Sequence, residues 1–368
     1  MIEPSVLMRI DTVFERAISA GQIPGGVVAV GWNGRVVFER CYGRRAIVPE
    51  SEAATVETIY DLASLTKVVA TTTAIMKLVE RGQISLNDRV SAHVHGWTDG
   101  ADGEEAATLR MLLTHTSGLA PFEKYYETIA PEGAMEAVVR DISKMPLQAK
   151  PEERFIYSDL GFILLGEIVR KVSGKSLDVF CRDEIFVPLG MLETTFNPSP
   201  VLREGIAPTQ WREDANAADG RVMIRGEVHD GNARLLGGVS GHAGLFSTSE
   251  DLSRFCQMLL NGGKLDGVRV LSSASVRAMT RDQARLGPNG VKRGYGWDID
   301  SSYSGPRGDL FAGGFGHTGW TGTSIWIIPE ENLYIIVLTN RIHSDGEGDA
   351  GPLRSKVANV VASSLLEI

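Results

Sequence analysis

The stretch Asp61-Leu62-Ala63-Ser64-Leu65-Thr66-Lys67 opens a long apolar segment that continues as Val68-Val69-Ala70-Thr71-Thr72-Thr73-Ala74-Ile75-Met76-Lys77-Leu78-Val79. The apolar residues recur at helical spacing, which predicts a helix with a buried face that ends at Gly82. Ser64 falls in the first turn of this helix, and Lys67 follows three residues later. Positions i and i+3 share a helix face, so we expect the hydroxyl and the amine to meet.

This pair suggests a nucleophile with its activator one turn away. A serine hydroxyl is a weak nucleophile unless a neighbouring group accepts its proton, and a desolvated lysine assists that step. Unpaired N–H groups and the positive end of the helix dipole would also lie beside Ser64. However, Ser-x-x-Lys is a short pattern, and a serine at a helix start is commonly only an N-cap. The rest of the chain has to decide between the two.

Composition narrows the class of protein. The chain has 368 residues, 43% of them hydrophobic and 23% charged, which suits one large globular domain or two. A net charge of -9 argues against a nucleic-acid partner, which would need a basic surface. No apolar run reaches the roughly 18 to 20 residues of a membrane span. The N-terminus carries no signal-like sequence, so we expect a cytoplasmic protein, or a periplasmic or secreted one if a leader has been removed.

Cysteine and histidine spacing predicts neither a metal site nor a bound cofactor. Cys41, Cys181 and Cys256 are far apart and odd in number, so buried free thiols are expected. His93-Val94-His95 has no accompanying ligand cluster, and we interpret it as structural. The glycine-rich segment 237–244 lacks the lysine that follows in a phosphate-binding loop.

Strand signals lie at both ends of the chain and helix signals lie between them. Asn33-Gly34 predicts a hairpin, and Pro329-Glu330-Glu331-Asn332 predicts another. We therefore expect an α/β (α+β) fold in which both termini build one antiparallel sheet. Residues 1–83 and 305–368 would form the sheet domain, and residues 84–304 an inserted, mainly helical domain. The expected elements are a helix at 5–20, strands at 25–30 and 36–41, a long loop at 198–248, strand signals at 310–312, strands at 323–328 and 333–338, and a helix at 352–366.

Three motifs in order carry a family resemblance: Ser64-Leu65-Thr66-Lys67, Tyr157-Ser158-Asp159 and His317-Thr318-Gly319. Together they resemble the serine β-lactamase and penicillin-binding family, in the branch of class C β-lactamases, D-Ala-D-Ala carboxypeptidases and family VIII esterases. The segments 112–119 and 241–247 resemble it too. The resemblance spans nearly the whole chain and implies a β-lactamase/DD-peptidase-like fold.

The resemblance also implies catalytic roles. Ser64 would attack a carbonyl carbon and form an acyl-enzyme. Lys67 would favour an anionic phenolate nearby, and Tyr157 would be the general base, since a phenol becomes useful when cations lower its pKa. The backbone N–H groups of Ser64 and Trp320 would form the oxyanion hole.

Substrate binding is expected at Asp159, His317, Thr318 and Gly319, with two departures from the usual pattern. Many members of the family have lysine at the position of His317, and a histidine gives only a partial charge at neutral pH. This weakens the case for an efficient β-lactamase. Asp159 replaces a frequent asparagine, and its carboxylate would keep Lys67 protonated and move the base role toward Tyr157.

Other polar and aromatic residues have weaker claims. We expect His115, His229 and His242 to be loop-bonding groups, and we place the pair His229-Asp230 outside the pocket. Some aromatic residues could wall a substrate pocket or belong to the core: Tyr125, Tyr126, Trp211, Trp297 and Trp320.

The sequence therefore predicts a cofactor-free serine hydrolase that acts on a small-molecule carboxylic ester, or on an amide of the β-lactam or D-amino-acid kind. The alternative is a penicillin-binding sensor or scaffold that acylates without efficient turnover. The natural substrate, the residue that binds its distal end and the oligomeric state stay open.

Overall fold

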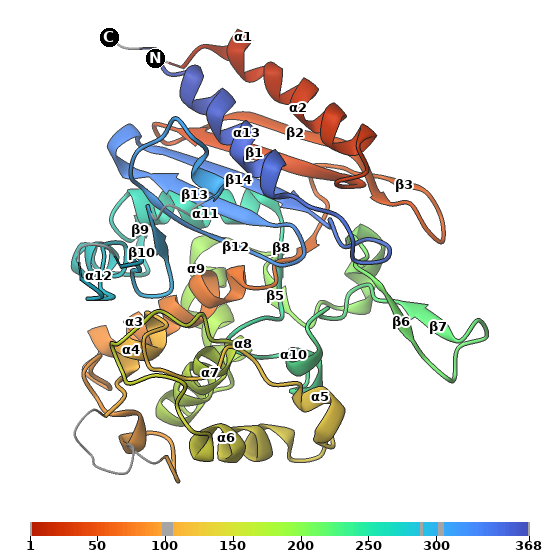
Figure 1. Ribbon diagram of the computed structural model, residues 1–368. Helices are drawn as coiled ribbons and strands as arrows, with labels where there is room; N and C mark the ends of the chain where they lie inside the picture. Colours follow the sequence, from red (N-terminus) through yellow and green to blue (C-terminus); the bar gives the residue numbers. More distant parts are fainter. Residues whose placement is uncertain (1, 98–105, 288–289, 301–304, 367–368) are drawn as a thin grey trace.

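A seven-stranded antiparallel sheet forms the centre of the fold, and its strands come from both ends of the chain (Figure 1). The computed structural model describes residues 2–97, 106–287, 290–300 and 305–366. The order across the sheet is β11-β12-β13-β14-β1-β2-β3. Its strands are β1 (Gly25–Trp32), β2 (Arg35–Ala46), β3 (Glu52–Ala53), β11 (Asp298–Ile299), β12 (Phe315–Thr318), β13 (Ser324–Ile328) and β14 (Leu333–Thr339).

The two predicted hairpins are confirmed. β1 pairs with β2 around Asn33 and Gly34, whose φ angles of 50° and 81° are typical of a tight hairpin turn. β13 pairs with β14 across the turn after Ile328. β1 and β14 lie next to each other in the sheet and are buried nearly throughout, which is why their sequences are continuous apolar runs rather than alternating ones.

Helices cover both faces of this sheet, as expected for a layered fold. On one face, the terminal helices pack over a separate apolar cluster that includes Phe14, Trp326 and Val357. On the other face, α11 and the helical region share one continuous core with the sheet (Figure 1). The helices of the first layer are α1 (Pro4–Leu7), α2 (Arg9–Ser19) and α13 (Gly351–Ser363), and α11 spans Ser249–Leu260.

The remaining elements lie mainly in the helical region. The helices are α3 (Thr73–Glu80), η2 (Val90–Ala92), α4 (Leu109–Leu113), α5 (Tyr125–Thr128), α6 (Ala134–Lys144), α7 (Asp159–Ser173), α8 (Leu177–Cys181), η3 (Arg182–Phe186), α9 (Val187–Leu189), η4 (Pro200–Gly205), α10 (Gly231–Leu235), α12 (Ser273–Met279), η5 (Gly305–Arg307) and η6 (Pro329–Glu331). The small sheets contain β4 (Tyr60–Asp61), β5 (Thr195–Phe196), β6 (Trp211–Glu213), β7 (Arg221–Met223), β8 (Leu245–Ser247), β9 (Lys264–Leu265) and β10 (Val268–Arg269).

The helix after Ser64 differs from the prediction of one regular helix. Residues Lys67–Thr72 form a π-helical stretch, η1, and α3 follows and ends at Glu80. Within it, Thr71 Oγ1 donates to Gly241 O at 2.7 Å, and Thr73 Oγ1 donates to Val68 O at 3.0 Å. Thr73 thus bonds a carbonyl group of the helix itself, whereas Thr71 ties the stretch to the distant loop at Gly241. Single π turns of this kind are frequent at functional sites.

Three other expectations need correction. The predicted helix at 5–20 is divided at Met8 into α1 and α2. The strand signals at 310–312 are wrong: the strand starts at Phe315, because Gly313 and Gly314 have φ angles of 88° and 86° that interrupt an extended chain. The segment 198–248 is not only a loop, since η4, β6, β7, α10 and β8 lie within it. The division into two domains stays a prediction.

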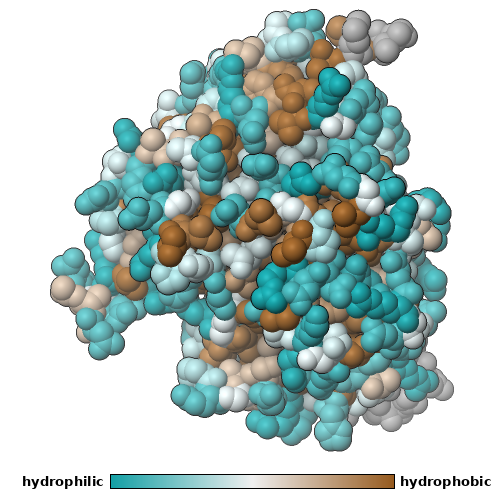
Figure 2. Space-filling model, turned by 180° about the vertical axis from the view of Figure 1, so that it is seen from behind, coloured by the Kyte–Doolittle hydropathy of each residue, from teal (hydrophilic) through white to brown (hydrophobic). Residues whose placement is uncertain are grey.

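The surface and the thiols complete this description. Cys181 and Cys256 are buried as free thiols, whereas Cys41 is only half-buried, contrary to expectation. Seen from behind, the surface is mostly hydrophilic, and apolar side chains gather across the middle of this face (Figure 2). Of the helices that the structure describes, none has the length and apolar character needed to cross a bilayer.

Candidate active site

Ser64 lies in the turn between β4 and η1, just before the helix rather than inside it. Asp61 holds this turn, because its Oδ1 accepts from the N–H of Ala63 at 2.9 Å. Ala63 has a φ of 46°, an unusual value for a residue with a side chain. β4 is fixed in turn by pairing with β8. The nucleophile candidate therefore stands on a constrained turn at the edge of the core.

Lys67 is completely buried, and its ammonium group contacts Ser64, His242 and Asp159. Nζ donates to Ser64 Oγ at 2.9 Å and to the carbonyl oxygen of His242 at 3.1 Å. It also forms an ion pair with Asp159 Oδ1 at 2.8 Å. Because Lys67 donates to Ser64, the serine hydroxyl keeps its own proton available for another acceptor.

Charge keeps Lys67 protonated in spite of its burial. Burial alone would lower the pKa of this lysine, but the carboxylate of Asp159 and the phenol of Tyr157 act in the opposite direction, and the net shift of the pKa is upward. Lys67 is therefore an ammonium ion at neutral pH and a poor proton acceptor. This agrees with the expectation drawn from the carboxylate at position 159.

Tyr157 and Asp159 reach the site from the start of α7. Ser158 is the N-cap of this helix, since its Oγ accepts from the N–H of Gly161 at 3.3 Å. The N–H of Ser158 donates to His115 Nδ1 at 2.9 Å, and this bond fixes the segment that carries Tyr157 and Asp159. The ring of Tyr157 lies near two imidazoles, with centroid distances of 4.4 Å to His115 and 6.0 Å to His317.

His317 sits on β12 and is neutral. It is 5% exposed, and burial together with the positive charges of Arg293 and Lys67 holds its pKa well below the usual value. Nδ1 donates to its neighbour's carbonyl, Thr318 O, at 2.8 Å, so the lone pair of the neutral ring is on Nε2. Nε2 has no hydrogen-bond partner among the described residues. His317 therefore presents an acceptor, not a cation.

Two adjoining hollows meet at Ser64. One, of about 550 Å³, is bordered by His317, Thr318 and Gly319. The other, of about 640 Å³, is bordered by Asp159. Ser64, Tyr157 and Trp320 line both of them. The predicted site residues other than Lys67 line this cleft, and Lys67 lies buried behind Ser64, in contact with its Oγ.

Three arginines at the first hollow had not been predicted. Arg293, Arg341 and Arg354 line it, and two carboxylates, Asp298 and Asp349, lie among them. Single arginines in loops or in a terminal helix carry no sequence signal, so only the fold shows that they meet. With three guanidinium groups and two carboxylates, this end of the cleft has an excess of positive side chains, although His317 itself is neutral.

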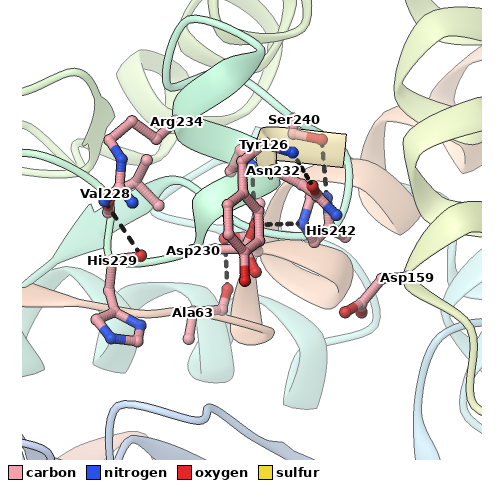
Figure 3. A network of polar contacts seen from close by, with 12 residues as sticks. Ala63, Tyr126, Asp159, Val228, His229, Asp230, Asn232, Arg234, Ser240 and His242 are labelled. Atoms are coloured by element: carbon pink, nitrogen blue, oxygen red, sulfur yellow. Dashed lines mark hydrogen bonds and ion pairs between the residues drawn. The ribbon is translucent and has the colours of Figure 1, made fainter. Parts of the chain in front are cut away.

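The second hollow contains residues that sequence reasoning had placed elsewhere. His229, Asp230 and His242 all line it, so the placement of the pair His229-Asp230 outside the pocket is wrong. His242 bridges Ser240 Oγ and Asp230 Oδ1 through its two ring nitrogens, each at 2.8 Å (Figure 3). As expected, it is a loop-bonding group, but one within the wall of the cleft.

The aromatic residues divide between the cleft and the core. Tyr126, Trp211 and Trp320 line the second hollow. Tyr125 and Trp297 are buried in the core, 2% and 0% exposed. Sequence alone could not separate the two groups, because both lie in glycine-rich or loop-like segments.

One group of described side chains brings potential metal ligands together. Oxygen atoms of Asp159 and Asp230 and a ring nitrogen of His242 lie within 4.8 Å of one another. However, both nitrogens of His242 are engaged, and Asp159 pairs with the ammonium of Lys67. A divalent cation here would have to displace these contacts and would be repelled by Lys67. The expectation of no metal site stays a prediction.

Comparison with known proteins identifies the family. The family model described as Beta-lactamase matches residues 10–359. The chain belongs to the beta-lactamase family. One relative is an N-acetylmuramyl-L-alanine amidase of Bacillus subtilis (strain 168). It is 34% identical, and the match covers 92% of this chain and 81% of the relative. A putative D-alanyl-D-alanine carboxypeptidase of Escherichia coli O157:H7 is 32% identical over 92% and 83%.

Solved structures agree with this fold. The octameric penicillin-binding protein homologue from Pyrococcus abyssi has a TM-score of 0.74 at 27% identity and covers 96% of this beta-lactamase-family chain and 76% of its own. The hydrolase EstCE1, with promiscuous acyltransferase activity, has a TM-score of 0.76 at 22% identity over 98% and 99%. The predicted fold class is confirmed.

Proposed function

We propose that this chain is a serine hydrolase that forms an acyl-enzyme on Ser64. The observation that carries the proposal is the 2.9 Å contact between Ser64 Oγ and the buried ammonium of Lys67, at the point where the two hollows of the cleft meet. A hydroxyl that accepts from a fixed cation while its proton stays available is prepared for attack on a carbonyl carbon.

In the proposed reaction, Tyr157 takes the proton of Ser64 as Oγ bonds to the carbonyl carbon. Tyr157 acts from its phenolate form beside the ammonium of Lys67, which also holds Oγ in place, while Asp159 keeps Lys67 protonated. Tyr157 then gives the proton to the leaving group as the old bond breaks, and a water molecule later releases the acyl group. The N–H groups of Ser64 and Trp320 would hold the oxyanion, and in the described part of the chain neither has a protein acceptor.

The proposed substrate is an amide whose leaving group carries a carboxylate. Two relatives above 30% identity are named as an amidase and a putative D-alanyl-D-alanine carboxypeptidase, and both names denote cleavage of amide bonds. The arginine-lined hollow beside Thr318 would suit the carboxylate of an amino acid or peptide leaving group. The aromatic hollow on the other side of Ser64 would hold the acyl part.

An ester substrate is the second candidate, and the neutral state of His317 favours it. Without a cation on β12, the cleft offers less to a free carboxylate next to the scissile bond than a lysine would. A carboxylic ester needs no such partner. The structure of EstCE1 shows that this fold exists in a hydrolase with acyltransferase activity.

A substrate panel with burst kinetics tests both candidates. The panel contains an N-acetylmuramyl-L-alanine peptide, a D-alanyl-D-alanine peptide, p-nitrophenyl butyrate and a chromogenic cephalosporin. Steady turnover of either peptide, lost in Ser64→Ala, is the expected result. Turnover of the butyrate alone would favour the ester. One equivalent of product without further release would instead identify a penicillin-binding sensor or scaffold, and unchanged turnover in Ser64→Ala would contradict the proposal altogether.

A further inference from the structure

The turn after β12 is tied by buried hydroxyls to the backbone that leads into Ser64. Thr321 Oγ1 donates to Asp61 O at 2.7 Å, and Thr323 Oγ1 donates to Leu62 O at 3.0 Å. The two threonines are 1% and 0% exposed. The bonds join segments more than 250 residues apart in sequence. One of these segments carries the N–H of Ser64 and the other carries the N–H of Trp320.

The segment that leads into Ser64 is also bonded on its other side. Leu62 N donates to Leu245 O at 2.9 Å, which continues the pairing of β4 with β8. At Gly319 the segments touch closely: a Cβ there would lie 2.4 Å from Leu62 O and 2.2 Å from Thr323 Oγ1. Only a glycine permits this approach. The separation of the two segments is therefore set by backbone contact and by the threonine hydroxyls.

Arg354 holds the same turn from the opposite side. Its Nη2 donates to Gly319 O at 3.0 Å and to Thr323 O at 2.9 Å. Gly319 O belongs to the same peptide group as the N–H of Trp320. A guanidinium at the carbonyl oxygen fixes the plane of this peptide and polarises its N–H. Since the N–H of Gly319 donates to Thr323 O at 2.7 Å, the turn has little freedom left.

We propose that Thr321 and Thr323 are positioning residues that set the spacing between the two oxyanion donors, the N–H groups of Ser64 and Trp320. The inference rests on the proposed function, because it needs an oxyanion to form at Ser64. The two hydroxyls touch neither substrate nor reacting atoms. They act by holding the peptide of Trp320 at a constant distance from the turn that contains Ser64.

This arrangement matters most in the transition state. An oxyanion is stabilised by donors at about 2.7 to 3.1 Å, and a donor displaced by about 1 Å can cost about 100-fold in rate. Ground-state binding uses other contacts along the cleft. Loss of a threonine hydroxyl should therefore lower kcat by about 10- to 100-fold and leave KM within about twofold.

Isosteric variants test the proposal on the full-length protein. Thr321→Val and Thr323→Val remove the donor and keep the shape, whereas Thr321→Ser and Thr323→Ser keep the donor. Thr339→Val is the matched control, since Thr339 Oγ1 donates to Gly322 O of the same turn at 3.3 Å without reaching the Ser64 segment. The measurements are kcat and KM on p-nitrophenyl butyrate, and the inhibition constant of phenylboronic acid, which forms a tetrahedral adduct with a nucleophilic serine.

The expected result is a parallel loss of kcat and of phenylboronic acid affinity in the valine variants, with both restored in the serine variants and unchanged in Thr339→Val. Valine variants with wild-type kcat, or with the same loss as Thr339→Val, would overturn the proposal. If a valine variant does not fold, the alanine variant is compared with the serine variant by the same criteria. Activity that survives in Ser64→Ala would refute the proposed function instead. The failure of the proposed function is thereby distinguished from the failure of the threonine proposal.

Discussion

At the scale of single residues, the division of labour between Lys67 and Tyr157 depends on one carboxylate. Asp159 lies 2.8 Å from Lys67 Nζ and keeps the buried lysine protonated. An ammonium ion cannot accept the proton of Ser64, and the acceptor proposed for it is the phenolate form of Tyr157. Lys67 is the first residue of η1, and Tyr157 lies in the loop before α7.

We expect Tyr157→Phe to reduce kcat by about 100- to 10,000-fold, the usual contribution of a general base. The ring keeps its contacts with His115 and His317, so the variant should fold normally. Steady-state kinetics and thermal denaturation check the two parts of this prediction. A near-normal rate in a folded variant would rule out Tyr157 as the base.

Asp159→Asn should move the basic limb of the pH–rate profile to lower pH. The carboxylate raises the pKa of Lys67, so its removal lets burial lower that pKa and the ammonium is lost sooner as pH rises. The measurement is kcat/KM across the pH range. Asp183→Asn, which removes an exposed carboxylate paired with Lys175, is the control and should leave the limb in place. An unshifted limb in Asp159→Asn would mean that this carboxylate does not govern Lys67.

At the scale of elements, β12 and its turn must lie against the Ser64 segment without a side chain between them. Gly319→Ala would bring a methyl group to 2.4 Å from Leu62 O, so the turn has to move. We expect a loss of kcat of about 100-fold or more, with a lower melting temperature. Gly205→Ala is the control, because nothing lies within 4 Å of a Cβ there. Equal activity in the two variants would show that the close approach is unimportant.

The sequence predicted those elements that a few neighbouring residues determine. The hairpin at Asn33 and Gly34 needs only two residues of positive φ between apolar strands. The π-helical stretch at Lys67–Thr72 was not predicted, and its apolar spacing is that of an ordinary helix; within it Thr71 donates to Gly241, a contact distant in sequence that no local pattern indicates. The strand starting at Phe315 was misplaced because Gly313 and Gly314 adopt positive φ angles in context.

At the scale of the whole molecule, the same contrast decides how much of the site was predictable. Ser64, Lys67, Tyr157 and His317 belong to ordered motifs; three of them line the cleft, and Lys67 contacts Ser64 from the core. The arginines of the first hollow and Asp230 of the second belong to no motif. Only the folding of one core across the sheet and the helical region places them beside the nucleophile.

That shared core also makes stability depend on pH. Burial lowers the pKa of four histidines, His115, His229, His317 and His343, and for His229 the value is about 4. In the unfolded chain the histidines have pKa values near 6.5 and bind protons that the folded chain does not bind. Their contribution to stability is therefore fully present above pH 6.5 and is lost as pH falls. Asp61 acts in the opposite sense, because burial raises its pKa to about 6 and the folded chain then gains protons first.

The histidines outweigh this single carboxyl group. At pH 5, His229 alone should lower the free energy of unfolding by about 2 kcal/mol, whereas Asp61 should raise it by about 1 kcal/mol. We therefore expect a lower free energy of unfolding at pH 5 than at pH 7 in denaturant titrations, and a smaller difference in His229→Gln. Equal stability at the two pH values would show that these imidazoles accept protons inside the folded chain, and the neutral state assigned to His317 would lose its basis with them.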